Sequence, residues 1–136
     1  MSFNRVTASV QARNDFGKCF DFYTTKLGLV PIFGDRNGPY TSFAGRKEEE
    51  PFFAIWDSKD DNQKVTGYVI PYNTASSDTL AAIFHTKNFE NDYNKLLNLG
   101  VEFIGKRAIA SDGFIINTAY FRDPEGNLLS LEDGGV

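Results

Sequence analysis

The same succession of secondary-structure elements is encoded twice along this chain of 136 residues. Each copy centres on an amphipathic helix that ends at a glycine: NDFGKCFDFYTTKLG stops at Gly28, and NFENDYNKLLNLG stops at Gly100. A polar N-cap residue begins each helix, Asn14 or Asp15 in the first and Asn88 in the second. A strand candidate precedes each helix, and a strand and a hairpin follow it. The order β-α-β-β-β is therefore predicted twice.

Two such units limit the fold to an α+β architecture. A repeat of this length that occurs only twice cannot build a solenoid, so the two units should pack as a pair around shared sheet. We predict a single domain, 1–136, made of units 4–58 and 79–133 joined by a connector, 59–78, with one extra strand at YVI in the connector. The helix stripes expected to pack on the sheets are Phe16, Phe20, Tyr23 and Leu27, and Phe89, Tyr93, Leu96 and Leu97.

Composition limits the class of protein and of partner. Hydrophobic residues make up 41% and charged residues 24%, as in soluble globular proteins. The net charge of −4 argues against a nucleic-acid partner, because phosphate binding needs clustered Lys and Arg. No run approaches the roughly 18 to 20 apolar residues that would cross a membrane. The single cysteine, Cys19, excludes an internal disulfide. The opening MSFNRVTASV lacks the apolar run of a signal peptide, so we expect a cytoplasmic protein.

Three segments carry a resemblance to a known superfamily. The helix ends FYTTKLGL and LLNLGVEF and the hairpin AYFRDPEGNLLSLED together resemble the vicinal oxygen chelate superfamily, which includes glyoxalase I, bleomycin-resistance proteins, extradiol dioxygenases and fosfomycin-modifying enzymes. The resemblance spans essentially the whole chain and is not specific for one activity. It implies that two βαβββ repeats form a curved mixed-sheet cup, and that the protein is a homodimer that binds a small molecule.

Enzymes of this superfamily commonly hold one divalent metal through His or Glu on the first strand of each half and a carboxylate on the last strand. The resemblance places Thr7, Ala8 or Ser9 at the first position and Ser130 at the third. The second position is Ala81, or its neighbour Leu80 or Ala82 if the register slips. A hard divalent cation needs several charged or carbonyl oxygens, or imidazoles, to compete with its hydration, and these side chains supply neither. We therefore expect no metal and no other cofactor.

The alternation of the last strand orients Ser130. In NLLSLED, Leu128, Ser130 and Glu132 share one face, whereas Leu129 and Leu131 share the other. The second face is purely apolar and should pack beneath a helix, so the mixed face is left to line the cup.

Further side chains are candidates for contact with a bound molecule. His85, the only histidine, shares a strand face with Ala81 and is therefore expected to face the cup. There it could supply a proton or a hydrogen bond to a ligand. The alternative is a solvated position at the end of the strand. On PFFAIWD, either Phe52, Ala54 and Trp56 or Phe53, Ile55 and Asp57 face the cup, and the sole tryptophan favours the first set. No catalytic residue is assigned. The candidate ligand-binding residues are His85, Trp56, Ser130, Tyr120, Tyr40, Gln11 and Asp57.

Three functions follow as hypotheses. The first is a binding protein of the bleomycin-resistance type that sequesters a toxic or antibiotic compound without bond making, and the acidic balance suits a cationic ligand. The second is a lyase, isomerase or dioxygenase-like enzyme with a displaced or absent metal site, in which His85 with Asp57 or Gln11 handles protons. A third is an interaction module whose cup is only a dimer surface. We expect no nucleic-acid or membrane partner in any of these.

Overall fold

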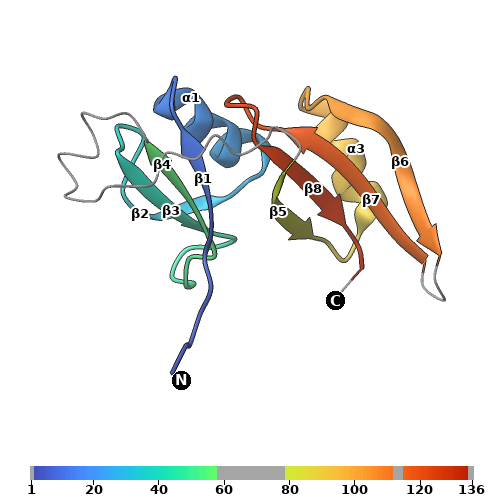
Figure 1. Ribbon diagram of the computed structural model, residues 1–136, viewed down its shortest axis with the longest axis horizontal. Helices are drawn as coiled ribbons and strands as arrows, with labels where there is room; N and C mark the ends of the chain where they lie inside the picture. The colour runs from blue at the N-terminus through green and yellow to red at the C-terminus, as the bar shows by residue number, and fades with distance from the viewer. Residues whose placement is uncertain (1, 58–78, 112–114, 135–136) are drawn as a thin grey trace. The chain divides into compact units, whose positions relative to one another are not determined.

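The structure is a computed structural model that describes residues 2–57, 79–111 and 115–134, with side chains described except at 106–111 and 115–116. The chain divides into two compact units, Met1–Ala75 and Ser76–Val136, each built on its own sheet (Figure 1). The extra strand expected at YVI lies outside the described residues. The single-domain organisation with units 4–58 and 79–133 stays a prediction.

The first unit contains a four-stranded mixed sheet and one helical segment. The strand order is β1-β4-β3-β2, in which β1 runs parallel to β4 and the other pairs are antiparallel. The α-helix continues directly into a short π-helix. The elements are β1 (Ala8–Ala12), α1 (Phe16–Asp21), η1 (Phe22–Lys26), β2 (Val30–Phe33), β3 (Tyr40–Ala44) and β4 (Phe53–Asp57).

The second unit repeats this topology. Its strand order is β5-β8-β7-β6, with β5 parallel to β8 and the remaining pairs antiparallel. The predicted order β-α-β-β-β is therefore confirmed in both units. The elements are β5 (Leu80–His85), α3 (Phe89–Asn98), β6 (Phe103–Ser111), β7 (Ile115–Arg122) and β8 (Leu128–Glu132).

The helix ends follow the residues that predicted them. Asp15, one of the two residues left open, caps α1 by accepting a hydrogen bond from the Lys18 backbone N–H at 3.0 Å. Asn88 caps α3 in the same way. Gly28 and Gly100 have φ values of +69° and +86°, a left-handed conformation that glycine adopts without steric cost.

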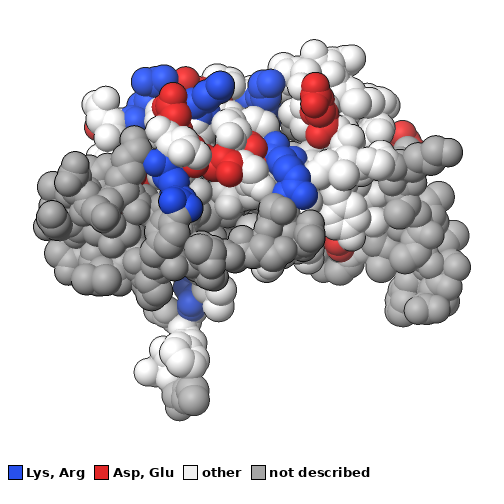
Figure 2. Space-filling view, turned by 45° about the horizontal axis from the view of Figure 1, so that its top comes forward, with Lys and Arg blue, Asp and Glu red and all other residues white. Residues whose placement is uncertain are grey.

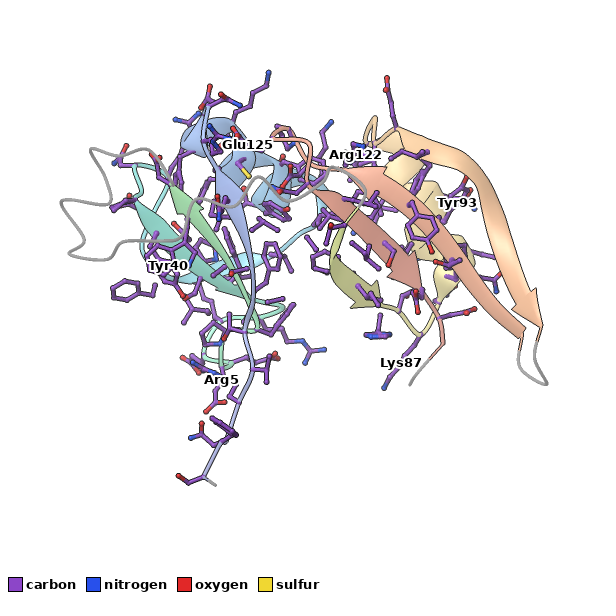
Figure 3. The ribbon with its side chains drawn as sticks, viewed as in Figure 1. Arg5, Tyr40, Lys87, Tyr93, Arg122 and Glu125 are labelled. Atoms are coloured by element: carbon purple, nitrogen blue, oxygen red, sulfur yellow. The ribbon has the colours of Figure 1, made fainter. Side chains whose placement is uncertain are left out.

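Aromatic side chains join each helical segment to one face of its sheet. In the first unit, Tyr23 is buried with its ring centroid 4.7 Å from that of Phe53 on β4. In the second, the Tyr93 ring lies 4.5 Å from Phe103 on β6, and Tyr93 is labelled in Figure 3. Cys19 is buried within α1, as expected of a small apolar residue. The prediction for Leu97 was wrong: it is 43% exposed, because the buried stripe of α3 is centred on Phe89 and Leu96.

An ion pair ties α1 to the loop between β2 and β3. Arg36 donates from Nε and Nη2 to the two carboxylate oxygens of Asp21, each at 2.9 Å. The guanidinium lies so close to Gly17 that a Cβ added there would come within 2.9 Å of it. The hydrogen bonds from Arg36 lower the pKa of Asp21 below its ordinary value. Arg36 therefore stabilises the ionised carboxylate.

The turn between β7 and β8 is organised by one buried carboxylate. Asp123 Oδ1 accepts hydrogen bonds from the backbone N–H groups of Glu125 and Asn127 at 2.9 and 3.0 Å, and Oδ2 accepts one from Asn127 Nδ2 at 2.8 Å. Gly126 takes a left-handed conformation, with φ of +87°. Arg122 Nη1 donates to the Gly126 carbonyl oxygen at 2.9 Å (Figure 3). These bonds fix where β8 begins.

The described surface mixes charges of both signs. On the face displayed in Figure 2, basic and acidic side chains are interspersed rather than gathered by sign. Within the described residues, no helix is both long and apolar enough to span a membrane.

Candidate functional site

Each sheet has one face packed on its helical segment and one opposite face, which we call its open face. Phe43 and Phe53 define the helix-packed face of the first sheet through their ring contacts with Tyr23. Paired residues on adjacent strands point to the same side, so the strand register assigns the remaining residues. The open face of the first sheet carries Ser9, Gln11, Phe33, Tyr40, Ser42, Ala54 and Trp56.

An aromatic group made of Phe33, Tyr40 and Trp56 dominates this open face. The ring centroids of Tyr40 and Trp56 are 4.3 Å apart, and those of Phe33 and Tyr40 are 6.1 Å apart. Phe33 is 67% exposed, and Tyr40 and Trp56 are partly exposed. Tyr40 is labelled in Figure 3. The aromatic group therefore offers flat apolar surface to solvent.

A bulge in the edge strand β2 brings Phe33 into this group. Simple alternation would place Phe33 on the side of Pro31, which pairs with Phe43 on the helix-packed face. The register shifts between Pro31 and Phe33, so that Phe33 pairs instead with Ser42 on the open face. Pro31 in LVPIF is typical of an edge strand or a bulge, but the sequence does not indicate to which side the shift turns Phe33.

The structure separates two of the predicted residues in the first unit. Gln11 is the strand partner of Trp56 and lies beside it on the open face. Asp57 points to the other side with Ile55 and is buried, and its backbone N–H donates to the Pro39 carbonyl oxygen at 2.7 Å. Of the two alternatives left open for this strand, the set with Phe52, Ala54 and Trp56 therefore faces away from the helix.

The open face of the second sheet is polar at its centre. The ring contact between Phe103 and Phe121 marks the helix-packed side, where Leu129 pairs with Phe121. The predicted alternation of β8 is confirmed, since Ser130 points to the opposite side. The open face carries Leu80, Ile83, His85, Thr118, Tyr120, Arg122, Leu128, Ser130 and Glu132.

Ser130 lies at the bottom of this face. Its strand partners are Ile83 and Tyr120, which are 42% and 37% exposed, whereas Ser130 itself is 0% exposed. The hydroxyl oxygens of Ser130 and Thr118 are buried and have no hydrogen-bond partner. A buried hydroxyl without a partner lowers the stability of the folded protein by on the order of 1–3 kcal/mol, so the two unpartnered hydroxyls call for an explanation.

His85 ends β5 on the same open face and is exposed. Its Nδ1 lies 2.9 Å from the carbonyl oxygen of Gly134. A carbonyl oxygen only accepts hydrogen bonds, so this contact assigns a proton to Nδ1. In the neutral ring, Nε2 is then an acceptor directed away from that bond.

Among the described residues, no three His, Cys, Asp or Glu side chains are grouped so that they could hold a metal ion. Of the positions matched to the metal ligands, Ser9 and Ser130 point to open faces, and Ala8 points to the helix-packed side. Alanine and neutral serine side chains offer no anionic or imidazole ligand.

A family model described as the Glyoxalase/Bleomycin resistance protein/Dioxygenase superfamily matches residues 3–131. The chain belongs to this superfamily. The resemblance found in the helix ends and the DPEGN hairpin is confirmed, as is the α+β fold built from two mixed sheets. No protein with a curated description matches the chain.

Solved structures of superfamily members share the fold. A glyoxalase/bleomycin resistance protein/dioxygenase from Nocardioides has a TM-score of 0.67 at 21% identity, covering 99% of this chain and 88% of that chain. TnmS3, an antibiotic binding protein from Streptomyces sp. CB03234, has a TM-score of 0.65 at 17% identity, covering 99% of both chains. A lactoylglutathione lyase from Agrobacterium tumefaciens has a TM-score of 0.69 at 15% identity, covering 98% of this chain and 96% of that chain. These identities show the fold alone, and the fold serves both a binding protein and an enzyme.

The ligand-binding candidates chosen from the sequence did not include Phe33, Ile83, Thr118 and Glu132, although Glu132 was expected on the cup-lining face with Ser130. Three of them could have been found, because alternation places Thr118 with Tyr120, Ile83 with His85, and Glu132 with Ser130. Phe33 could not, because its orientation depends on the bulge.

Proposed function

We propose that this protein binds a small organic molecule on the open faces of its sheets, without a metal at the position that the superfamily's enzymes use. The observation that carries the proposal is the aromatic group of Phe33, Tyr40 and Trp56. Its rings are packed against one another on the side away from the helix.

The aromatic group favours a ligand with a flat apolar or cationic part. Stacked or edge-to-face aromatic pairs contribute about 0.5–1.5 kcal/mol beyond their area burial, and a cation over an aromatic face gains a similar amount. The net charge of −4 supports a cationic ligand. An antibiotic or other toxic compound with such a group is the ligand class we propose, in line with the antibiotic binding described for TnmS3.

Binding without metal chemistry is supported by the donor set. The resemblance places Ser130 at the position of the carboxylate ligand, and a neutral hydroxyl cannot supply the charge that a divalent cation requires. The enzyme alternative is supported by one observation, the acceptor at His85 Nε2, which could take a proton from a substrate. A homodimeric state and a cytoplasmic location are part of the proposal.

Trp56 is the only tryptophan in the chain, so its fluorescence reports on the proposed site alone. We suggest a thermal-shift screen of cationic and neutral aromatic compounds, followed by titration of Trp56 emission with each stabilising compound. A ligand at 100 times its dissociation constant should raise the free energy of unfolding by about 2.7 kcal/mol. Metal analysis of protein purified without chelators separates the binding protein from a metal-dependent enzyme.

Two exposed phenylalanines give a matched pair of variants. Phe33→Ala removes a member of the aromatic group, whereas Phe3→Ala removes an exposed ring outside the strands. The proposal predicts that Phe33→Ala weakens binding about 3- to 10-fold and that Phe3→Ala leaves the dissociation constant unchanged. Equal effects of the two changes, or stabilising compounds that leave Trp56 emission unchanged, would contradict it.

A further inference from the structure

We propose that the open face of the second sheet binds a protonated amine, with Glu132, His85 and Thr118 as its hydrogen-bond acceptors. The inference rests on the proposed function and adds the chemical class of the ligand group that this face recognises.

The three residues form a row across three adjacent strands. His85 on β5 is the strand partner of Glu132 on β8, and Glu132 is the strand partner of Thr118 on β7. Partners point to the same side, and neighbouring strands are about 4.8 Å apart, so the row is about 10 Å wide. Ser130 lies two residues before Glu132 on the same face and borders the row.

Each member of the row presents an acceptor. The ionised Glu132 carboxylate only accepts hydrogen bonds. The contact of His85 Nδ1 with the Gly134 carbonyl oxygen places a proton on Nδ1, so the neutral form of the ring has Nε2 as an acceptor. Thr118 Oγ1 is buried without a partner and can accept a donor from a ligand.

The two hydroxyls are independent evidence that a partner is missing. Ser130 is fully buried, and its oxygen and that of Thr118 are the buried side-chain atoms that lack a hydrogen bond among the described residues. They lie on one face and on neighbouring strands, diagonal to each other across the Tyr120 and Glu132 positions. Tyr120 lies on the same face beside both of them and is 37% exposed.

An ammonium group suits the row better than other ions. It carries three donors and no acceptor, which matches three acceptors of which one is anionic. The negative charge of Glu132 repels an anion. A divalent metal would find two ligand types, His85 and Glu132, where it needs three or more. None of the salt bridges in the described part of the chain involves Glu132, so its charge is not already paired there.

The sole histidine provides the readout, because its imidazole resonances in an NMR spectrum report on this row alone. Benzylamine is the probe, with benzyl alcohol as its uncharged analogue and benzyltrimethylammonium as a cation without N–H donors. Benzylamine should shift the His85 resonances saturably. Both analogues should bind at least about 5-fold more weakly, because one lacks the charge and the other lacks the donors.

Variants separate the row from general electrostatics. Glu132→Gln should weaken benzylamine binding at least about 10-fold, and Thr118→Val should weaken it about 3- to 10-fold. Glu102→Gln is the matched control, because it removes the same charge from an exposed position just before β6 and should leave the dissociation constant unchanged.

Three results would overturn the inference: no saturable shift with benzylamine, equal shifts with benzyl alcohol, or equal effects of Glu132→Gln and Glu102→Gln. A stoichiometric amount of zinc chloride is tested in the same way. If it shifts the His85 resonances, and if this shift is absent in Glu132→Gln, then the row is a metal site and not an amine site. Failure of the proposed function is distinguishable, because it would appear as unchanged Trp56 emission throughout the compound screen.

Discussion

Replacing Thr118 by Val should make the folded protein more stable while weakening ligand binding. Valine has nearly the shape of threonine and a similar preference for strands, so the change replaces only the hydroxyl by a methyl group. In the folded protein this hydroxyl is buried without a partner, whereas in the unfolded chain it is hydrated. Its removal therefore eliminates a desolvation cost that only the folded state carries.

The magnitude follows from that cost. A buried polar group without a partner costs on the order of 1–3 kcal/mol, so Thr118→Val should raise the free energy of unfolding by about 1 kcal/mol or more. For a chain of this size, 1 kcal/mol corresponds to about 3–5 °C in Tm. Ser130→Ala should act in the same direction, because Ser130 Oγ is also buried and unpartnered.

Thr41 is the matched control for this prediction. Its side chain is fully buried, but its hydroxyl donates to the Asp35 carbonyl oxygen at 2.8 Å. Thr41→Val should therefore lower the free energy of unfolding by about 1 kcal/mol. Urea unfolding of the wild type and the variants, followed by circular dichroism, measures all of these differences. If Thr118→Val destabilises the protein as much as Thr41→Val does, then the Thr118 hydroxyl has a partner, and the reasoning for both open-face hydroxyls is refuted.

Two further predictions concern contacts within the individual units. Asp123→Ala should lower the free energy of unfolding by about 2–4 kcal/mol, because three hydrogen bonds to a buried carboxylate are lost. Asp123→Asn should lower it less, because the asparagine Oδ1 can still accept the two backbone hydrogen bonds. Equal losses for the two variants in urea unfolding would show that the carboxylate does not organise the turn. The ion pair of Asp21 and Arg36 should stabilise the fold above the ordinary Asp pKa of 3.8, and this contribution should disappear as the pH falls through the lowered pKa of Asp21. The stability difference between wild type and Arg36→Gln should therefore shrink at acid pH, and a difference that persists unchanged would exclude the ion pair as its source.

The sequence predicted the element order and the helix ends because those signals are local. Asp15, Gly28, Asn88 and Gly100 act within a few residues of their own position, through side-chain caps and backbone conformation. The alternation of β8 was predictable for a similar reason, because Leu129 and Leu131 form a purely apolar face that can only be buried.

What the sequence could not predict depends on strand register. The face of β4 was undecided because Phe52, Ala54 and Trp56 are about as apolar as Phe53 and Ile55, so neither set was excluded from the core. Contacts with Tyr23 settled it, and they also placed Asp57 away from Trp56. Phe33 turned to the open face through a bulge, which depends on pairing with β3 rather than on its own neighbours.

The most direct test of the account is an NMR titration of isotope-labelled protein with any compound that passes the thermal-shift screen. We predict that the indole Nε1–H resonance of Trp56 and the resonances of other open-face residues, such as the Gln11 side-chain amide, will shift together and saturate at one dissociation constant. Resonances of Ile55 and Tyr23, which lie between helix and sheet, should move much less. Shifts confined to the helices or to the helix-packed face, with the Trp56 indole unmoved at saturation, would contradict the claim that the open faces bind the ligand.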